Sequence, residues 1–496
     1  MMAYPILTIL VFLPLAGAFA LLPFWRRDRW AKGFALCCAL VELALAGWLL
    51  FAASGMQAAQ GAPAGYFLWE DYTWIGRFGI SYTLGMDGIS LLMTVLTAFV
   101  TLLAMLVSWR GIRERVPLHY LMLLVMESGI VGVFLALDLF LFYLFWEVML
   151  IPMFFLIGIW GHGRRIYSAV KFFIYTMAGS LLMLLAIIGI YLLHGNQGGN
   201  YTFALHQLIG TGIDPGISLW LFAAFLLAFA IKVPVFPLHT WLPDAHTDAP
   251  TAGSVILAGL LLKTGAYGLI RFGYPLFPTA AKAVTPLLIT LAVIGIVYGS
   301  WVAYAQEDMK RLVAYSSVGH MGFVALGIAV WSPVALSGAV LQMVNHGITT
   351  GALFALVGML DERTDTREIA AYGGVWGKAP MLAFFFLLFS MASAGLPGLN
   401  NFVGEFLILA GAFRVTPLAV VIGFIGIVLP LIYTVRLVQQ VLFVEERRPL
   451  AIPDLTIREG SVLAALALIA IYLGVHPAPL LDLLKVPVAL LTGVAP

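Results

Sequence analysis

Charged residues are scarce in this sequence. Asp, Glu, Lys and Arg make up 10% of its 496 residues, whereas hydrophobic residues make up 62%. Soluble domains contain about 25% charged and about 45–50% apolar residues. Because so few charges could not cover the surface of a chain of this length in water, we predict an integral membrane protein.

An excess of charge of one sign is also missing. The 26 Lys and Arg residues nearly balance the 24 Asp and Glu residues, and the net charge is +2. Basic runs with interleaved aromatic residues, which mark nucleic-acid binding, are absent from the sequence. We therefore exclude a nucleic-acid partner.

Cysteine is nearly absent. Cys37 and Cys38 are adjacent, so they cannot form a Cys-x-x-Cys site, and two thiols are too few for a zinc site or an iron–sulfur cluster. We expect both to be packing residues. No metal site or bound cofactor is expected in this chain, and any redox cofactor would then belong to a partner.

Long apolar runs are what the sequence has in abundance. A membrane-crossing helix needs about 20 mostly apolar residues, whereas barrel strands alternate in segments of about ten. Fourteen stretches satisfy the first pattern, at 4–24, 31–53, 87–109, 117–136, 139–160, 168–193, 218–238, 248–272, 283–304, 311–331, 333–359, 380–412, 417–440 and 461–481. We therefore predict an all-α polytopic bundle of about 14 transmembrane helices.

The loop charges predict the orientation of the bundle. The first stretch has no positive segment before it, and its basic cluster follows at 26–32, which favours an uncleaved span with the N-terminus outside. In that orientation the inner loops carry most Lys and Arg residues, including those at 110–115 and 363–378 and Lys310, and the outer loops carry few, such as Arg77, Arg271 and Lys282. An even number of spans places the C-terminus outside as well, and the pattern suits a bacterial plasma membrane.

Ionisable residues inside the predicted spans are candidates for function. A charge at the bilayer centre costs about 2.5–3.5 kcal/mol, although a structural ion pair or a snorkelling side chain is an alternative for each. The candidates are Glu42, Glu127, Glu147, Lys232, Lys263, His320, His346, Glu405 and Arg436. Arg436 lies near the inner end of its span, which favours snorkelling, and Glu42 has no evident partner. Function is favoured for the four central residues on different spans: Glu147, Lys232, Lys263 and Glu405.

Two predicted spans are interrupted beside these charges. Pro234 and Pro237 follow Lys232, and Pro397 and Gly398 precede Glu405. Proline removes an amide donor and frees a carbonyl one turn earlier, so each span should be broken there. Two broken spans in related positions indicate an inverted repeat with an ion path near the midplane, although the two halves show no strong self-similarity.

The buried charges are suited to carrying protons. Burial makes a lysine release its proton more readily, and a nearby carboxylate makes it hold the proton. A pair formed by Glu147 and Lys232 could therefore switch between the two states. Lys263, His320 and His346 could pass the proton on, since imidazole both donates and accepts near neutral pH.

A polar turn follows the first broken span. His239, Asp244, His246 and Asp248 could suggest a metal site, but their spacing matches no standard ligand set. A hydrogen-bonded loop at the inner mouth of a proton path is favoured.

Several long motifs resemble the antiporter-like subunits of respiratory complex I. They are Phe-Trp-Glu-Val-Met-Leu-Ile-Pro around Glu147, Gly-Met-Asp-Gly-Ile-Ser at 85–90, and the runs at 232–268, 308–322 and 395–405. The resemblance covers about residues 80–440. The family includes the L, M and N types of complex I, subunits of multi-subunit Na⁺/H⁺ antiporters and membrane subunits of some hydrogenases. Glu405 stands where the L, N and antiporter types usually have lysine, and it is similar to the M type. The absence of a long extension after the last span also argues against the L type.

The resemblance implies a fold and a set of roles. It implies two inverted five-helix repeats, spans four to eight and nine to thirteen, with helices 7 and 12 broken. The segments would be 1–110 (spans 1–3), 111–275 (first repeat), 276–445 (second repeat) and 446–496 (last span). The implied proton-translocating residues are the pair Glu147 and Lys232, the connecting Lys263, the axial His320 and His346, Glu405 toward the outer exit, and Glu127.

The resemblance also implies a function and partners. The chain would be a non-redox, proton-translocating subunit of the membrane arm of an NADH–quinone oxidoreductase, embedded in lipid between L-type and N-type neighbours. FMN, iron–sulfur clusters and quinone would be bound by partner subunits. A cation/proton antiporter subunit, a hydrogenase membrane subunit, an independent solute transporter and a passive structural spacer remain open alternatives.

Overall fold

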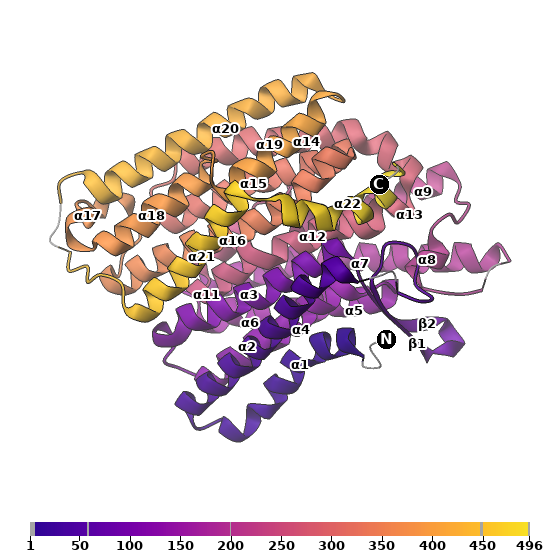
Figure 1. Ribbon diagram of the computed structural model, residues 1–496, viewed down its shortest axis with the longest axis horizontal. Coiled ribbons are helices and arrows are strands. Elements are labelled where there is room, and N and C mark those ends of the chain that lie inside the picture. Colours follow the sequence, from indigo (N-terminus) through magenta and orange to yellow (C-terminus); the bar gives the residue numbers. More distant parts are fainter. Residues whose placement is uncertain (1–4, 57–58, 199, 447–449, 495–496) are drawn as a thin grey trace.

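The computed structural model describes residues 5–56, 59–198, 200–446 and 450–494. Within these ranges, thirteen helical segments are long and apolar enough to cross a membrane, and they lie side by side in one bundle (Figure 1). They are α1 (Ile6–Ala20), α2 (Asp28–Ala52), α3 (Gly88–Gly111), α4 (Val116–Leu135), α5 with α6 (Leu139–Val148 and Leu150–Trp160), α7 (Arg165–Asn196), α9 (Pro215–Lys232), α11 to α13 (Thr251–Leu276), α14 (Pro278–Tyr304), α15 (Met309–Val330), α16 (Pro333–Thr364), α20 with its last turn (Pro417–Phe443) and α21 (Ile457–Val475). The prediction of an all-α polytopic membrane protein is confirmed.

The remaining predicted span is split into two shorter helices. The stretch predicted at 380–412 forms α18 (Pro380–Ser393) and α19 (Asn400–Phe413). Gly395 and Gly398 between them have φ angles of +77° and +93°, which glycine adopts without the steric cost that a side chain would add. The chain can therefore turn sharply between the two half-helices, in front of Glu405.

The other predicted break lies where the prolines place it. Helix α9 ends at Lys232, and α10 (Trp241–Asp248) begins after an irregular segment that contains Pro234 and Pro237. Both half-helix pairs therefore confirm the expected interruptions. The inverted relation between the two halves stays a prediction.

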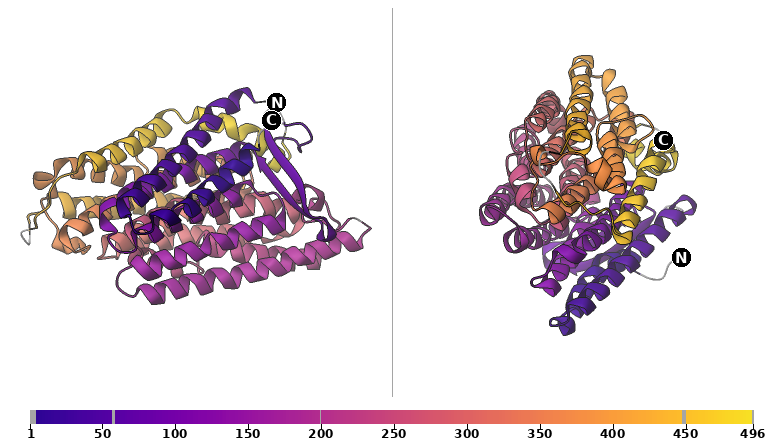
Figure 2. Two further views of the ribbon diagram at one scale, coloured as in Figure 1. Left: turned by 90° about the horizontal axis from the view of Figure 1, so that it is seen from below. Right: turned by 90° about the vertical axis from the view of Figure 1, so that its left-hand side faces the viewer.

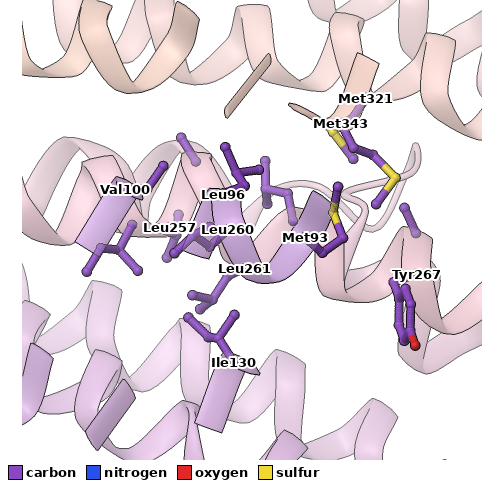
Figure 3. Packing of buried hydrophobic residues seen from close by; sticks show 14 of the residues in the cluster. Met93, Leu96, Val100, Ile130, Leu257, Leu260, Leu261, Tyr267, Met321 and Met343 are labelled. Atoms are coloured by element: carbon purple, nitrogen blue, oxygen red, sulfur yellow. The ribbon is translucent and has the colours of Figure 1, made fainter. Parts of the chain in front are cut away.

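The span Thr251–Leu276 is deeply buried in the bundle, as is α16. Two wide π-helical turns, Leu257–Leu261 and Leu269–Gly273, interrupt it on either side of α12 (Leu262–Gly268). Figure 3 shows Leu257, Leu260 and Leu261 packed near Leu96 and Val100 of α3 and Ile130 of α4. Such turns occur frequently at functional sites because they change the backbone hydrogen-bonding pattern.

A β-hairpin is the main element that the sequence analysis missed. Strands β1 (Leu68–Ile75) and β2 (Ile80–Met86) pair antiparallel, with Tyr72 opposite Tyr82. The hairpin stands at the end of the bundle that holds both chain ends (Figure 2). Its Trp, Tyr, Thr and Ile residues are good strand formers and were the available signal.

A final helix, α22 (Ala478–Thr492), was also not predicted. It packs closely on the start of α3, because a Cβ at Gly88 would lie 1.9 Å from the carbonyl oxygen of Leu483. Figure 1 shows α1 and α2 along one edge of the bundle, α20 along the opposite edge, and α12 and α16 between them. The central candidates Lys263 and His346 lie on α12 and α16.

Candidate functional site

Lys232 lies in an aromatic enclosure at the broken end of α9. Its side chain is 0% exposed, and its Nζ is 5.4 Å from the ring centroid of Trp146 and 5.3 Å from that of Phe172. The Nζ makes no hydrogen bond to any described residue. The negative faces of aromatic rings attract a cation, so they support an ammonium group that lacks a direct counter-charge.

The end of α9 is held by contacts from the next half-helix. The indole Nε1 of Trp241 donates to the carbonyl of Ile231 at 2.9 Å, and the amide of Val235 donates to the carbonyl of Ala230 at 2.9 Å. These bonds satisfy carbonyls that a continuous helix would have bonded internally. The break in the helix beside Lys232 is therefore stabilised by specific hydrogen bonds.

The carboxylate of Glu147 is the predicted partner of Lys232, but the two side chains are not in contact. Glu147 is partly buried on α5, and its charge is close enough to act on Lys232. No salt bridge within 4.0 Å joins these two residues, and Oε1 of Glu147 has no hydrogen-bond partner in the described chain. The two residues of the predicted pair therefore interact through their charges, without a direct hydrogen bond.

Lys263 is in direct contact with a histidine. Its Nζ lies 2.7 Å from Nδ1 of His346 and also donates to the carbonyl oxygen of Ala258. Ala258 belongs to the π-helical turn just before α12, so the widened turn supplies a carbonyl that the lysine can reach. Both Lys263 and His346 are 0% exposed.

A second histidine connects this pair to Glu405. The ring centroids of His346 and His320 are 5.8 Å apart, and Nδ1 of His320 lies 2.7 Å from Oε1 of Glu405. Nε2 of His320 lies 3.3 Å from Oγ of Ser393, and Gln342 Nε2 donates to Oε1 of Glu405 at 3.0 Å. Glu405 is therefore held beside the break between α18 and α19.

These contacts form what we call the central row: Lys263, His346, His320 and Glu405. Its members come from four helices, namely α12, α16, α15 and α19. Close helix packing makes the row possible, since Gly338 and Gly411 bring the backbones of α16 and α19 together; an added Cβ there would lie 2.8 Å and 2.4 Å from backbone nitrogens of the facing helix. Each member carries a side chain that can bind or release a proton.

Glu127 lies outside the central row. It is on α4, and among the described residues the charged group that acts on it is Glu42 of α2. The structure therefore groups these two carboxyls with each other and not with Lys263 or Glu405. Arg436 donates to the carbonyl of Tyr304 at 2.7 Å, at an exposed helix end that fits the snorkelling interpretation.

The polar turn after α9 is tied to its neighbours by hydrogen bonds. Lys171 Nζ donates to Asp244 at 2.7 Å, and Ser168 Oγ donates to Asp248 at 2.6 Å. His239 stacks on Phe236. His246 is fully buried, stacks on Phe354 with centroids 4.5 Å apart, and lies within reach of the charge of Lys263.

Two basic residues expected in loops are buried instead. Arg271 is 4% exposed within the turn Leu269–Gly273, and its Nη2 donates to Asp87 at 2.5 Å and its Nη1 to the hydroxyl of Tyr66 at 3.0 Å. Lys310 is 3% exposed and donates to the carbonyl of Ala249 at 2.5 Å. Hydropathy placed both near span ends, and the partners that draw them inside lie far away in the sequence. The signal for Arg271 was Asp87, within the motif at 85–90.

A charged hollow opens at the loop end of the bundle near His246. It has a volume of about 1,240 Å³ and is lined by His162, Asp308, Asp361 and Arg367, together with Pro250 and Thr251 at the start of α11. The pKa of His162 is lowered, first by burial and then by Lys310. The hollow gives water access to the start of α11.

Comparisons with known proteins match this architecture. The model of the NADH:quinone oxidoreductase/Mrp antiporter transmembrane family matches residues 136–430. NADH-quinone oxidoreductase subunit M of Pseudomonas aeruginosa is 46% identical, covering 96% of both chains, and that of Escherichia coli strain K12 is 44% identical, covering 95% of both. A chain of respiratory complex I from Thermus thermophilus with bound NADH has a TM-score of 0.87 at 32% identity, over 98% of this chain and 100% of that one. A chain of the Mrp complex from Dietzia sp. has a TM-score of 0.86 at 22% identity, over 98% and 97% of the two chains, which shows the shared fold alone.

Proposed function

Because this chain belongs to the NADH:quinone oxidoreductase/Mrp antiporter family, we propose that it moves protons across a bacterial inner membrane as the M-type subunit of an NADH-quinone oxidoreductase. The chain is an antiporter-like membrane subunit of a multi-subunit assembly. Its full-length similarity to subunit M proteins favours the oxidoreductase over a cation/proton antiporter or a hydrogenase.

The central row is the observation that carries the proposal. Three of its members are histidine or lysine groups that exchange protons readily, and the fourth is a carboxyl group hydrogen-bonded to His320. Contacts of 2.7 Å at both ends suit direct proton transfer. Rotation of a ring or one water molecule would bridge the longer step between His346 and His320.

Lys232 and Glu147 provide the switch in this proposal. With its proton bound, Lys232 has aromatic faces and one distant carboxylate as support. If Glu147 is neutralised or displaced, this support weakens and the buried ammonium group releases its proton. Lys263 then accepts a proton and passes it through His346 and His320 to Glu405.

The remaining roles follow from the family and the sequence. We assign FMN, iron–sulfur clusters and quinone to partner subunits, since two adjacent cysteines cannot hold a cluster. The neighbours are L-type and N-type subunits, and both termini lie on the outer side. The segments 1–110, 111–275, 276–445 and 446–496 stand as the three first spans, the two repeats and the last span.

The test uses neutral substitutions in the assembled complex. Lys232→Gln and Glu147→Gln should each lower the number of protons pumped per NADH oxidised in sealed membrane vesicles. Lys485→Gln is the matched control, because its side chain is 71% exposed and lies far from the row in the sequence. If both variants pump as many protons per NADH oxidised as the wild type, the proposed relay is wrong. Purification of the chain without flavin and iron–sulfur absorbance would favour the antiporter alternative.

A further inference from the structure

Glu42 and Glu127 are two buried carboxyl groups that the central row does not use. Glu42 lies on α2 and Glu127 on α4, and both side chains are 0% exposed. None of their four carboxyl oxygens has a hydrogen-bond partner among the described residues, and neither residue takes part in a salt bridge there. Helices α2 and α4 pack against each other, and Glu127 lies within range of the charge of Glu42.

The surrounding helices offer no nearby cation. Helix α1 carries no titratable side chain, and on α3 only Arg110, near its end, is charged. Lys32 of α2 is ten residues from Glu42, about 15 Å along the helix axis, and its Nζ already donates to the carbonyl of Trp109 at 2.6 Å. Cys38, one turn before Glu42, is a thiol within range of Glu127.

The helices on the other side of α4 do not change this balance. Helix α5 carries Tyr143 and Glu147, α6 carries no titratable side chain, and α12 carries Lys263 and Tyr267. Among the described residues, Glu42 is the charged group that acts on Glu127. In the part of the chain that the structure describes, the two carboxyls therefore have no cation as a partner.

The lack of a nearby cation determines what the two carboxyl groups bind. An ionised carboxylate without a partner in the membrane interior carries a large desolvation penalty and takes up a proton instead. Two adjacent carboxylates cannot both stay ionised because like charges repel. A protonated carboxyl is neutral and so avoids most of the desolvation penalty that an unpaired buried charge carries.

We propose that Glu42 and Glu127 form a proton-binding site in which the two buried carboxyl groups hold at least one proton between them at neutral pH, separate from the central row. This inference goes beyond the proposed function, since it requires neither NADH oxidation nor the Lys232 switch. A monovalent cation is the alternative ligand, but two carboxyl groups alone supply too few oxygens for one.

A buried histidine lies on α4 between Glu127 and one end of the bundle. His119 lies eight residues before Glu127 on α4, about 12 Å along the axis, and is 0% exposed with neither ring nitrogen hydrogen-bonded to a described residue. The charge of Lys32 acts on His119. A hollow of about 500 Å³, lined by Asp28, Lys32 and Arg113, opens at that end. In this proposal, His119 is the group through which the proton exchanges with water at that end.

Infrared spectroscopy of the purified complex tests the site directly. A protonated carboxyl has a C=O stretching band that an ionised carboxylate lacks. The spectrum of the wild type minus that of the Glu42→Gln/Glu127→Gln double variant should contain such a band at neutral pH, and each single variant should lose part of it and shift the rest. Glu307→Gln is the control, because Glu307 is an exposed loop residue outside this site and its replacement should leave the band unchanged.

The outcomes separate this site from the proposed pump. A double variant that loses no protonated-carboxyl band overturns the proposal, and so does a wild-type band that emerges only when Na⁺ is withdrawn. His119→Phe keeps an aromatic ring against Trp160, whose centroid is 5.0 Å away, and should slow the isotope shift of the band in heavy water. An unchanged rate would refute the route. Loss of pumping in Lys232→Gln, with this band retained, would leave the inference standing.

Discussion

Gly265 is the point at which α12 touches the broken end of α9. A Cβ at this position would lie 2.7 Å from Cβ of Lys232, 2.7 Å from the carbonyl oxygen of Phe229 and 3.0 Å from Cγ2 of Val233. The first two atoms belong to the backbone or to the root of a side chain, so neither can swing aside. Gly265→Ala must therefore push the two helices apart.

The cost follows from two opposing effects. Overpacking a well-packed core costs about 1–3 kcal/mol, and the better helix propensity of alanine over glycine returns about 1 kcal/mol. Because two contacts fall well below normal van der Waals distance, we expect the upper end of the range and a net loss of about 2 kcal/mol. The same displacement moves the ammonium group of Lys232 relative to the rings of Trp146 and Phe172, so proton transfer should suffer as well.

The assay compares thermal stability and pumping in one preparation. Gly265→Ala should lower the unfolding midpoint of the chain in the purified complex and the protons pumped per NADH oxidised. Gly295→Ala on α14 is the matched control, since an added Cβ there meets nothing within 4 Å. If Gly265→Ala is as stable and as active as the control, the argued contact between α9 and α12 is wrong.

Three further predictions rest on single contacts. Arg271→Met leaves Asp87 as a buried charge without its partner and should cost about 3–5 kcal/mol, which reduces the yield of assembled complex; Arg271→Met with Asp87→Asn should recover part of that yield. Trp241→Phe leaves the carbonyl of Ile231 unsatisfied and should cost about 1–3 kcal/mol in thermal unfolding, whereas an unchanged midpoint would contradict the capping role. The pKa of His162 is lowered by burial, so the unfolded chain binds more protons as the pH falls below about 6.5 and stability is lost toward the lower folded pKa. His162→Gln should therefore make the unfolding midpoint less sensitive to acid.

Helix positions could be predicted from the sequence because the bilayer imposes a length and a composition on each span. The stretch predicted at 117–136 is α4 at Val116–Leu135. The break after Lys232 could be predicted as well, since proline lacks the amide that a continuous helix needs. These features depend on local chemistry alone.

Other features could not be found in this way. The hairpin formed by β1 and β2 lies between two obvious spans, and its pairing depends on contacts between strands. The π-helical turn at Leu257–Leu261 consists of ordinary apolar residues, so nothing in its composition separates it from a regular helix. Arg271 looked like a loop residue until its contact with Asp87, 184 positions away, placed it inside.

The sequence by itself determined that this protein lies in a membrane, about where its spans lie, and that Lys232, Lys263 and Glu405 are buried within them. The tertiary structure decided which of those residues meet. It joins Lys263 to His346 across 83 positions and His320 to Glu405 across 85, and it sets Glu127 beside Glu42. The physical reason is that the sequence pattern does not distinguish one apolar helix face from another. Lipid is as apolar as leucine, so hydrophobicity does not select a partner helix. Close packing of small residues, as between α16 and α19, makes that selection, and it is settled only in the folded bundle.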